Sequence, residues 1–193
     1  DLSTFHPDCR DESLRRELGL EDHVRLLAFA GRGSREKNLD ELLEAARLLG
    51  PDYHLLLIGS GMPRHLPDNV SVTGHFCSST EVARLVASVD VLLHAGTQET
   101  FGLVVLEAMA ARLPFVASGE AYRPLVESLG DQAAELAFPE GDPQALADRI
   151  QQLWEQPRAT RETLGNDLRD IVVRDHEVDD LMGRLVQFMG KGS

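Results

Sequence analysis

Short apolar segments alternate with amphipathic segments along most of this chain, from about residue 24 onward. Short apolar runs bounded by Gly or Pro are typical of buried strands, and apolar residues at helical spacing indicate helices. This alternation predicts an α/β fold, a doubly wound parallel sheet with helices on both faces and ligands at the carboxyl ends of the strands. The predicted strands span residues 24–30, 53–58, 70–73, 91–94, 114–117 and 135–138, and the predicted helices span 39–49, 79–88, the segment from Gly102 to Leu113-Pro114, 124–129, 142–154 and 159–189.

The domain organisation follows from the same pattern. A chain of 193 residues has the size of one domain, or of one domain with a helical tail. We expect residues 1–155 to form the α/β domain and residues 156–193 to form a helical tail that packs on it. Gly165 and Gly183 are expected weak points in that tail, because glycine disfavours a helix interior.

Composition excludes several classes of function. The net charge of −13 argues against nucleic acid as a partner and against a main anchor to an anionic membrane. Cys9 and Cys77 show no paired spacing, so we expect reduced thiols and a cytoplasmic location. No apolar run approaches the ~20 residues of a membrane span, and no signal peptide opens the sequence.

Residues 98–118 combine two carboxylates with a strongly apolar helix pattern. The amides of Gly102, Leu103 and Val104 would start that helix, and free amides at a helix start can hold a phosphate. Glu107 lies among apolar neighbours, where an unpaired acid is costly and is usually partnered or functional. The plainer interpretation is that Glu99 caps the helix and Glu107 is solvated.

Two cations follow the first predicted strand. Arg32 and Lys37 come just after Gly31, in a polar loop, where they can clamp a diphosphate. On spacing alone, two solvated loop cations are the favoured interpretation. Gly59-Ser60-Gly61 follows the second strand and by itself indicates only a turn.

The histidines indicate no metal site at the level of sequence. None of the seven forms a recognisable ligand cluster, so we expect no bound metal. His75 and Phe76 follow the third strand as a turn and a buried aromatic residue. His94 ends the fourth strand and is expected to be packed and hydrogen-bonded.

The stretch from Gln98 to Ser118 resembles the Glu-seven-residues-Glu signature of retaining glycosyltransferases with the GT-B fold, specifically glycosyltransferase family 4. Gly31-Arg32 followed by Lys37 matches the same family, and the resemblance extends from Asp1 to about Leu153. It implies a Rossmann-like domain that forms the donor-binding, C-terminal half of such an enzyme. The chain departs from the family pattern at His94-Ala95, at Arg112 and in residues 118–124.

The resemblance also implies roles for individual residues. Arg32 and Lys37 would grip the diphosphate of a nucleotide sugar and stabilise it as it leaves, while Glu107 would bind the ribose and Glu99 would orient the sugar. No cofactor or metal is implied, because cations and helix dipoles neutralise the leaving diphosphate. Further binding residues implied by the family pattern are Gly31, Gly59, Gly61, His75, Phe76, Phe101, Gly102, Leu103 and Val104, with the backbone near His75 and Phe76 reading the nucleobase.

The expected activity is retaining transfer of a sugar to an acceptor, a glycan or a lipid, held by an N-terminal domain that this sequence lacks. We therefore expect a fragment that binds donor and turns it over poorly, from an enzyme that associates peripherally with membranes. Two alternatives stay open at this stage. One is a nucleotide-binding module without catalysis, and the other is a nucleotide-sugar epimerase or a phosphorylase of the same fold.

Overall fold

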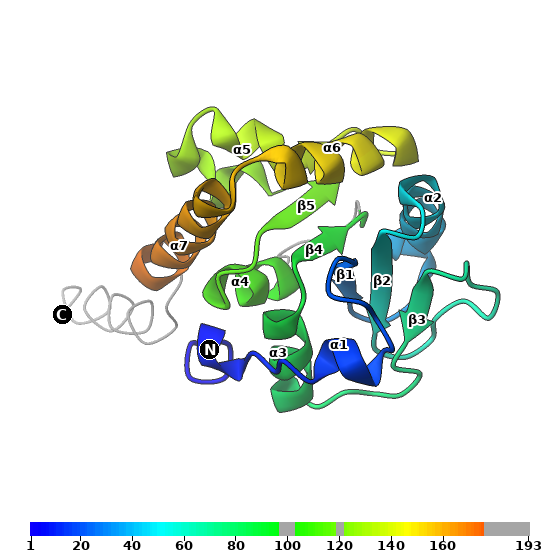
Figure 1. Cartoon of the computed structure of the whole chain (residues 1–193). Helices are drawn as coiled ribbons and strands as arrows, with labels where there is room; N and C mark the ends of the chain where they lie inside the picture. The colour runs from blue at the N-terminus through cyan, green and yellow to red at the C-terminus, as the bar shows by residue number, and fades with distance from the viewer. Residues whose placement is uncertain (97–102, 119–121, 176–193) are drawn as a thin grey trace, which may run out of the picture.

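The computed structural model describes residues 1–96, 103–118 and 122–175, shown in Figure 1. Within these residues, six parallel strands form one sheet in the order β3-β2-β1-β4-β5-β6. This confirms the predicted doubly wound fold, since the chain starts at the centre and builds outward in both directions. The strands are β1 (Arg25–Ala30), β2 (Tyr53–Ile58), β3 (Val70–Val72), β4 (Val91–His94), β5 (Phe115–Ser118) and β6 (Ala137–Phe138).

The central strands are apolar at nearly every position because the sheet is covered on both faces. Every residue of β1 from Leu26 to Ala30 is buried, as is every residue of β4. Parallel strands need such continuous apolar runs, which is why the sequence pattern locates them well. β1 pairs with β2 on one side and with β4 on the other. The strand order therefore reverses between β1 and β4, where a doubly wound sheet leaves a crevice for a ligand.

Helices cover both faces of the sheet (Figure 1). Helix α2 (Leu39–Leu49) packs against α6 (Pro143–Glu155), and α4 (Leu103–Ala110) packs against α3 (Ser79–Ser88) and α7 (Arg158–Asp175). Asp142 caps α6 by accepting a hydrogen bond from the amide of Ala145, as expected for an Asp-Pro start. Among the described residues, no helix is both long and apolar enough to cross a membrane.

Helix α7 continues past Gly165 without a break, so the expectation of a weak point there is wrong. Gly165 is buried, and a Cβ atom at this position would lie 2.4 Å from the carbonyl oxygen of Arg112. Glycine therefore allows α7 to approach the end of α4 closely. Leu164, Leu168, Ile171 and Val172 of α7 join the same buried cluster as the sheet. Gly183 and residues 176–189 of the predicted helix lie outside the described residues.

The segment between β5 and β6 differs from the predicted helix at 124–129. It forms two 3₁₀ turns, Arg123–Leu125 and Glu127–Leu129, separated by Val126 at a non-helical φ of −123°. A short helix α5 (Gln132–Glu135) then leads into β6, so the last strand is shorter than the predicted 135–138. Near the start of the chain, the 3₁₀ turn η1 (Pro7–Cys9) precedes α1 (Leu14–Glu17).

Candidate functional site

A cavity of about 760 Å³ opens at the carboxyl ends of β1, β2 and β4, next to the start of α4. This is the crevice where the strand order reverses, the usual ligand site of a doubly wound sheet. Its lining residues come from the β1–α2 loop, the β2 end, the loop before α3 and the first turns of α4. They are Ala30, Gly31, Arg32, Ser34, Glu36, Lys37, Ile58, Gly59, Ser60, Phe76, Cys77, Val82, His94, Leu103, Val104 and Glu107.

Glycines bring the ends of β1 and β2 together along one wall of this cavity. The amide of Gly31 donates to the carbonyl of Ile58 at 3.0 Å, and the amide of Gly33 donates to the carbonyl of Ser60 at 2.9 Å. Gly59 adopts a φ of +125°, and a Cβ atom there would lie 2.1 Å from the carbonyl oxygen of Gly31. A larger residue at position 59 would push the two loops apart. The wall therefore carries no side chain at Gly31 and Gly59, which leaves room for a ligand.

Two cations lie in the loop that follows β1. Arg32 and Lys37 both line the cavity, and Asn38 closes the loop in the left-handed conformation at φ 48°. The side-chain amide of Asn38 donates to the carbonyl of Ala95 at 3.0 Å, which ties this loop to the end of β4. Glu36 also lines the cavity, and a hydrogen bond from the Ser34 hydroxyl lowers the pKa of its carboxyl. The cavity mouth thus carries two positive charges and one negative charge.

Helix α4 supplies the opposite wall. Leu103 and Val104 begin the helix and line the cavity, so its first amides, which lack acceptors within the helix, lie at this wall. Glu107 lies one turn further on and is half-buried among apolar residues. Burial raises the pKa of its carboxyl to about 7. The sequence prediction of an acid in a costly apolar setting agrees with this shift.

His94 forms part of the cavity floor at the end of β4 and is 1% exposed. Its Nδ1 accepts a hydrogen bond from the amide of Gly96 at 3.2 Å, and the Tyr122 hydroxyl lies 3.1 Å from the same atom. Burial, with a smaller contribution from the charge of Lys37, lowers the pKa of His94 to about 4. The ring is therefore neutral at pH 7, packed and hydrogen-bonded as expected.

The structure brings most of the predicted site residues together and separates two. Gly31, Arg32, Lys37, Gly59, Phe76, Leu103, Val104 and Glu107 all line the cavity. Gly61 instead faces a neighbouring hollow near Gly33, and the ring of His75 turns away to contact Glu81. Phe76 is 85% exposed, so the expectation that it is buried is wrong. Glu99, Phe101 and Gly102 lie outside the described residues.

The expectation that no histidine belongs to a ligand-like cluster is also wrong. Polar atoms of His75, Cys77 and Glu81 all lie within 4.8 Å of one another. The sequence signal was the spacing His-x-Cys-x-x-x-Glu across a turn and a helix start. Cys77 and Val82 also line the cavity without having been predicted, because their position depends on how the loops pack.

Arg112, a departure from the family pattern, is remote from this cavity. It follows the end of α4 at a φ of 61° and lines a separate hollow with Trp154 and Arg161. A positive φ suits glycine, which is the residue of the family pattern at this position. Arginine in place of that glycine therefore changes the strain of the turn and leaves the cavity lining untouched.

Comparison with known proteins identifies the family to which this chain belongs. The family described as "Glycosyl transferases group 1" matches residues 10–170, and the chain belongs to this family. A relative from Mycobacterium tuberculosis, a GDP-mannose-dependent alpha-(1-6)-phosphatidylinositol dimannoside mannosyltransferase, is 32% identical over 170 residues. That match covers 83% of this chain and 43% of the relative, so the chain spans less than half of the relative's length.

Solved structures agree with the fold class. A sucrose-phosphate synthase from Thermosynechococcus elongatus superposes with a TM-score of 0.79 and 26% identity, over 100% of this chain and 51% of that one. The C-terminal domain of a glycosyl transferase group 1 family protein (LpcC) from Francisella tularensis gives a TM-score of 0.73 and 21% identity, over 92% of this chain and 98% of that one. The Rossmann-like α/β fold with a doubly wound parallel sheet, expected from the sequence, is thereby confirmed.

Proposed function

We propose that this chain is the donor-binding, C-terminal domain of a retaining glycosyltransferase of family 4 and binds a nucleoside diphosphate sugar. The observation that carries the proposal is one cavity, at the strand-order reversal, that is lined by Arg32, Lys37, the start of α4 and Glu107. Two cations and free helix amides suit a diphosphate, and a carboxylate suits the vicinal hydroxyls of a ribose.

In this proposal the diphosphate lies between the β1–α2 loop and the start of α4. Arg32 and Lys37 stabilise the negative charge that grows on the diphosphate as the bond to the sugar breaks. Neutralisation by these side chains and by the helix dipole makes the transfer step independent of a metal ion. Glu107 accepts hydrogen bonds from the ribose, and Glu99 orients the sugar through its hydroxyls. The acceptor, a glycan or a lipid, would bind to an N-terminal domain.

The half-buried state of Glu107 supports its assignment. An acid whose pKa is about 7 in a cavity is poorly solvated, and hydroxyl donors from a ribose would replace the water that it lacks. Support for a nucleotide sugar as ligand also comes from the mannosyltransferase relative, whose name specifies GDP-mannose. The base that this chain prefers is tested directly by comparing GDP, UDP and ADP.

Calorimetric titration with GDP, UDP and ADP, and with their sugar conjugates, tests the proposal. Arg32→Ala and Lys37→Ala should each weaken binding of the preferred diphosphate by ~1.5–3 kcal/mol, the range for hydrogen bonds to charged groups. Arg35→Ala is the matched control, because Arg35 is an exposed cation of the same loop that does not line the cavity. Equal losses in all three variants, or none in any, would contradict the clamp.

Two further variants test which part of the ligand each glutamate binds. Glu107→Gln should weaken binding of the nucleoside diphosphate and leave inorganic pyrophosphate binding nearly unchanged. Glu99→Ala should weaken binding of the nucleotide sugar but not of the bare diphosphate. Binding without hydrolysis or epimerisation of the sugar nucleotide agrees with a donor domain, whereas epimerisation by this chain would favour the alternative enzyme class.

A further inference from the structure

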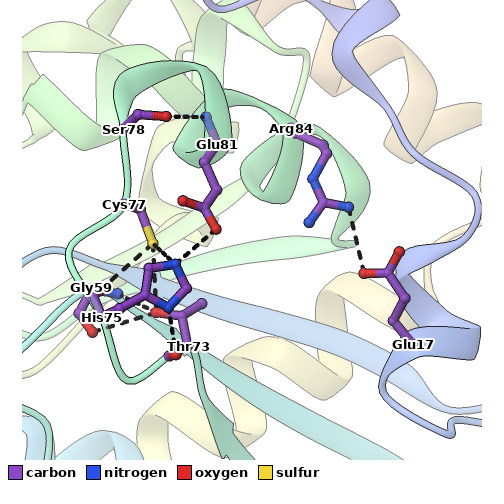
Figure 2. A network of polar contacts seen from close by, with 8 residues as sticks. All are labelled: Glu17, Gly59, Thr73, His75, Cys77, Ser78, Glu81 and Arg84. Carbon is purple, nitrogen blue, oxygen red and sulfur yellow. Dashed lines mark hydrogen bonds and ion pairs between the residues drawn. The ribbon is translucent and has the colours of Figure 1, made fainter.

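We propose that His75, Cys77 and Glu81 form a binding site for a single Zn²⁺ ion in the loop between β3 and α3. Nothing in the proposed transfer chemistry calls for this ion, so the proposal stands on the geometry of the loop alone. The three side chains converge from a turn and from the first turn of α3, as Figure 2 shows.

The three donor atoms lie within 4.8 Å of one another, near the spacing of the ligands around a zinc ion. His75 Nε2 lies 2.9 Å from Glu81 Oε1, and Cys77 Sγ lies 3.8 Å from His75 Nε2. Zinc bonds of ~2.0 Å to nitrogen and oxygen and ~2.3 Å to sulfur place tetrahedral ligands roughly 3.3–3.6 Å apart. Small side-chain rotations would therefore bring all three atoms around one ion.

The histidine ring is already oriented for a metal. Nδ1 of His75 lies 2.8 Å from the carbonyl oxygen of Thr73, which can only accept, so Nδ1 carries a proton and donates it. In the neutral ring, Nε2 then presents its lone pair toward Glu81 and Cys77. Metal-binding histidines commonly donate their second ring N–H to a backbone carbonyl in this way. Nε2 faces both the Glu81 carboxylate and the Cys77 sulfur. Because a carboxylate can only accept, a proton or a metal ion lies between it and Nε2.

The backbone around the three ligands is held in place. The Thr73 hydroxyl accepts a hydrogen bond from the amide of Gly59 at 2.9 Å, which anchors the end of β3 to the end of β2. The Ser78 hydroxyl accepts from the amide of Glu81 at 3.2 Å and caps α3, so the carboxylate projects from a fixed helix start. Cys77 is 7% exposed, which orders its thiol. A backbone held in this way lowers the conformational entropy that metal binding costs.

The chemistry of the donors selects the metal. A thiolate and an imidazole favour Zn²⁺ over Mg²⁺ or Ca²⁺, which prefer oxygen ligands. Binding displaces the thiol proton of Cys77 and any proton on Nε2 of His75, because both ligands must be deprotonated. Three protein ligands leave a fourth position for water. Zn²⁺ with one thiolate, one carboxylate and a neutral imidazole has no net charge.

The ion would act on the geometry of the cavity wall. Phe76 lies between two of the ligands and is 85% exposed, and both Phe76 and Cys77 line the cavity. Coordination on either side of Phe76 would fix the direction in which its ring is presented. An effect of this fixed ring on nucleotide affinity rests on the proposed function. Metal binding itself does not.

Titration of the purified protein with Zn²⁺ against a chromophoric chelator, and with Co²⁺ followed by absorption spectroscopy, tests the site. The wild type should bind one equivalent of Zn²⁺, and its Co²⁺ form should show a thiolate-to-cobalt charge-transfer band. Cys77→Ser and His75→Gln should each lower Zn²⁺ affinity by at least about 100-fold, more than the loss of an outer-shell partner. Cys9→Ser is the matched control, because Cys9 donates to the carbonyl of Thr4, remote in sequence from the cluster, and should change nothing.

Two results would overturn the proposal. One is a wild-type protein that fails to compete with the chelator for Zn²⁺, and the other is Co²⁺ bound without a charge-transfer band. The band reports the Cys77 thiolate in the unaltered protein, so the test holds even if a variant misfolds. Nucleotide affinity measured with Zn²⁺ and after chelation then separates the two proposals, since a zinc site can be present whether or not the cavity binds a nucleotide.

Discussion

Replacing Glu107 with Gln should stabilise the folded protein at neutral pH. The carboxyl is half-buried in α4, and burial raises its pKa from the ordinary 4.5 to about 7. A raised pKa means that the folded state holds the proton more tightly than the unfolded state does. The free energy of unfolding therefore falls as pH rises from about 4.5 to about 7, and stays at the lower level above that range. The side-chain amide of the Glu107→Gln variant carries no charge at any pH, so the variant escapes this loss.

The magnitude follows from the two pKa values. The full shift corresponds to roughly 3 kcal/mol, at 1.36 kcal/mol for each tenfold change in proton affinity. Partial contact with solvent screens the charge, so we expect a gain of ~1–2 kcal/mol for Glu107→Gln at pH 8 relative to pH 4.5. His94 titrates in an overlapping range with the opposite sign, because burial lowers its pKa to about 4. It does so in both proteins, and its contribution cancels in the difference between them.

Urea denaturation of the wild type and of Glu107→Gln from pH 5 to pH 8 measures this difference. The gap between the two free energies of unfolding should widen with pH and level off above about pH 7. Glu155→Gln, at an exposed position near the end of α6, serves as the control for removal of a glutamate charge from a helix surface. A gap for Glu107→Gln that is flat across this range, or that narrows as pH rises, would refute the argument.

Three further substitutions test packing and ion pairing away from the cavity. Gly165→Ala should cost ~1–3 kcal/mol by urea denaturation, because its Cβ atom would lie 2.4 Å from the carbonyl oxygen of Arg112; a neutral outcome would mean that α7 docks differently. Arg112→Gly should raise the melting temperature by relieving a φ of 61°, a gain of about 1 kcal/mol, and a lower melting temperature would show that its side chain contributes contacts. Asp90→Asn should cost ~1.5–3 kcal/mol, because Asp90 accepts from Arg15 at 2.6 Å and from the amide of Leu26 at 2.8 Å; a cost no larger at low salt than at high salt would argue against the ion pair.

The strands were predictable because a covered parallel sheet needs apolar residues at consecutive positions. β2 and β4 match their predicted bounds, and β1 begins only one residue later than expected. The region from 122 to 138 was harder, since its 3₁₀ turns depend on where single residues such as Val126 leave helical geometry. Gly165 was misjudged because its role depends on Arg112, a neighbour that is distant in sequence.

The candidate site was predictable to the extent that strand ends converge. Arg32, Gly59 and Glu107 follow or face the ends of neighbouring strands, so the topology alone brings them to one cavity. The grouping of His75 with Cys77 and Glu81 could not be predicted from the topology of the strands. It depends on the turn after β3, which folds the His75 ring back toward the first turn of α3.

The most direct test of the central claim is a crystal structure of this protein with whichever of GDP and UDP binds more tightly. Our account predicts that the diphosphate contacts Arg32 and Lys37 and meets the first amides of α4, with the ribose hydroxyls within hydrogen-bond distance of the Glu107 carboxylate. A nucleotide bound elsewhere on the sheet, or in this cavity with its ribose directed away from Glu107, would contradict the assignment.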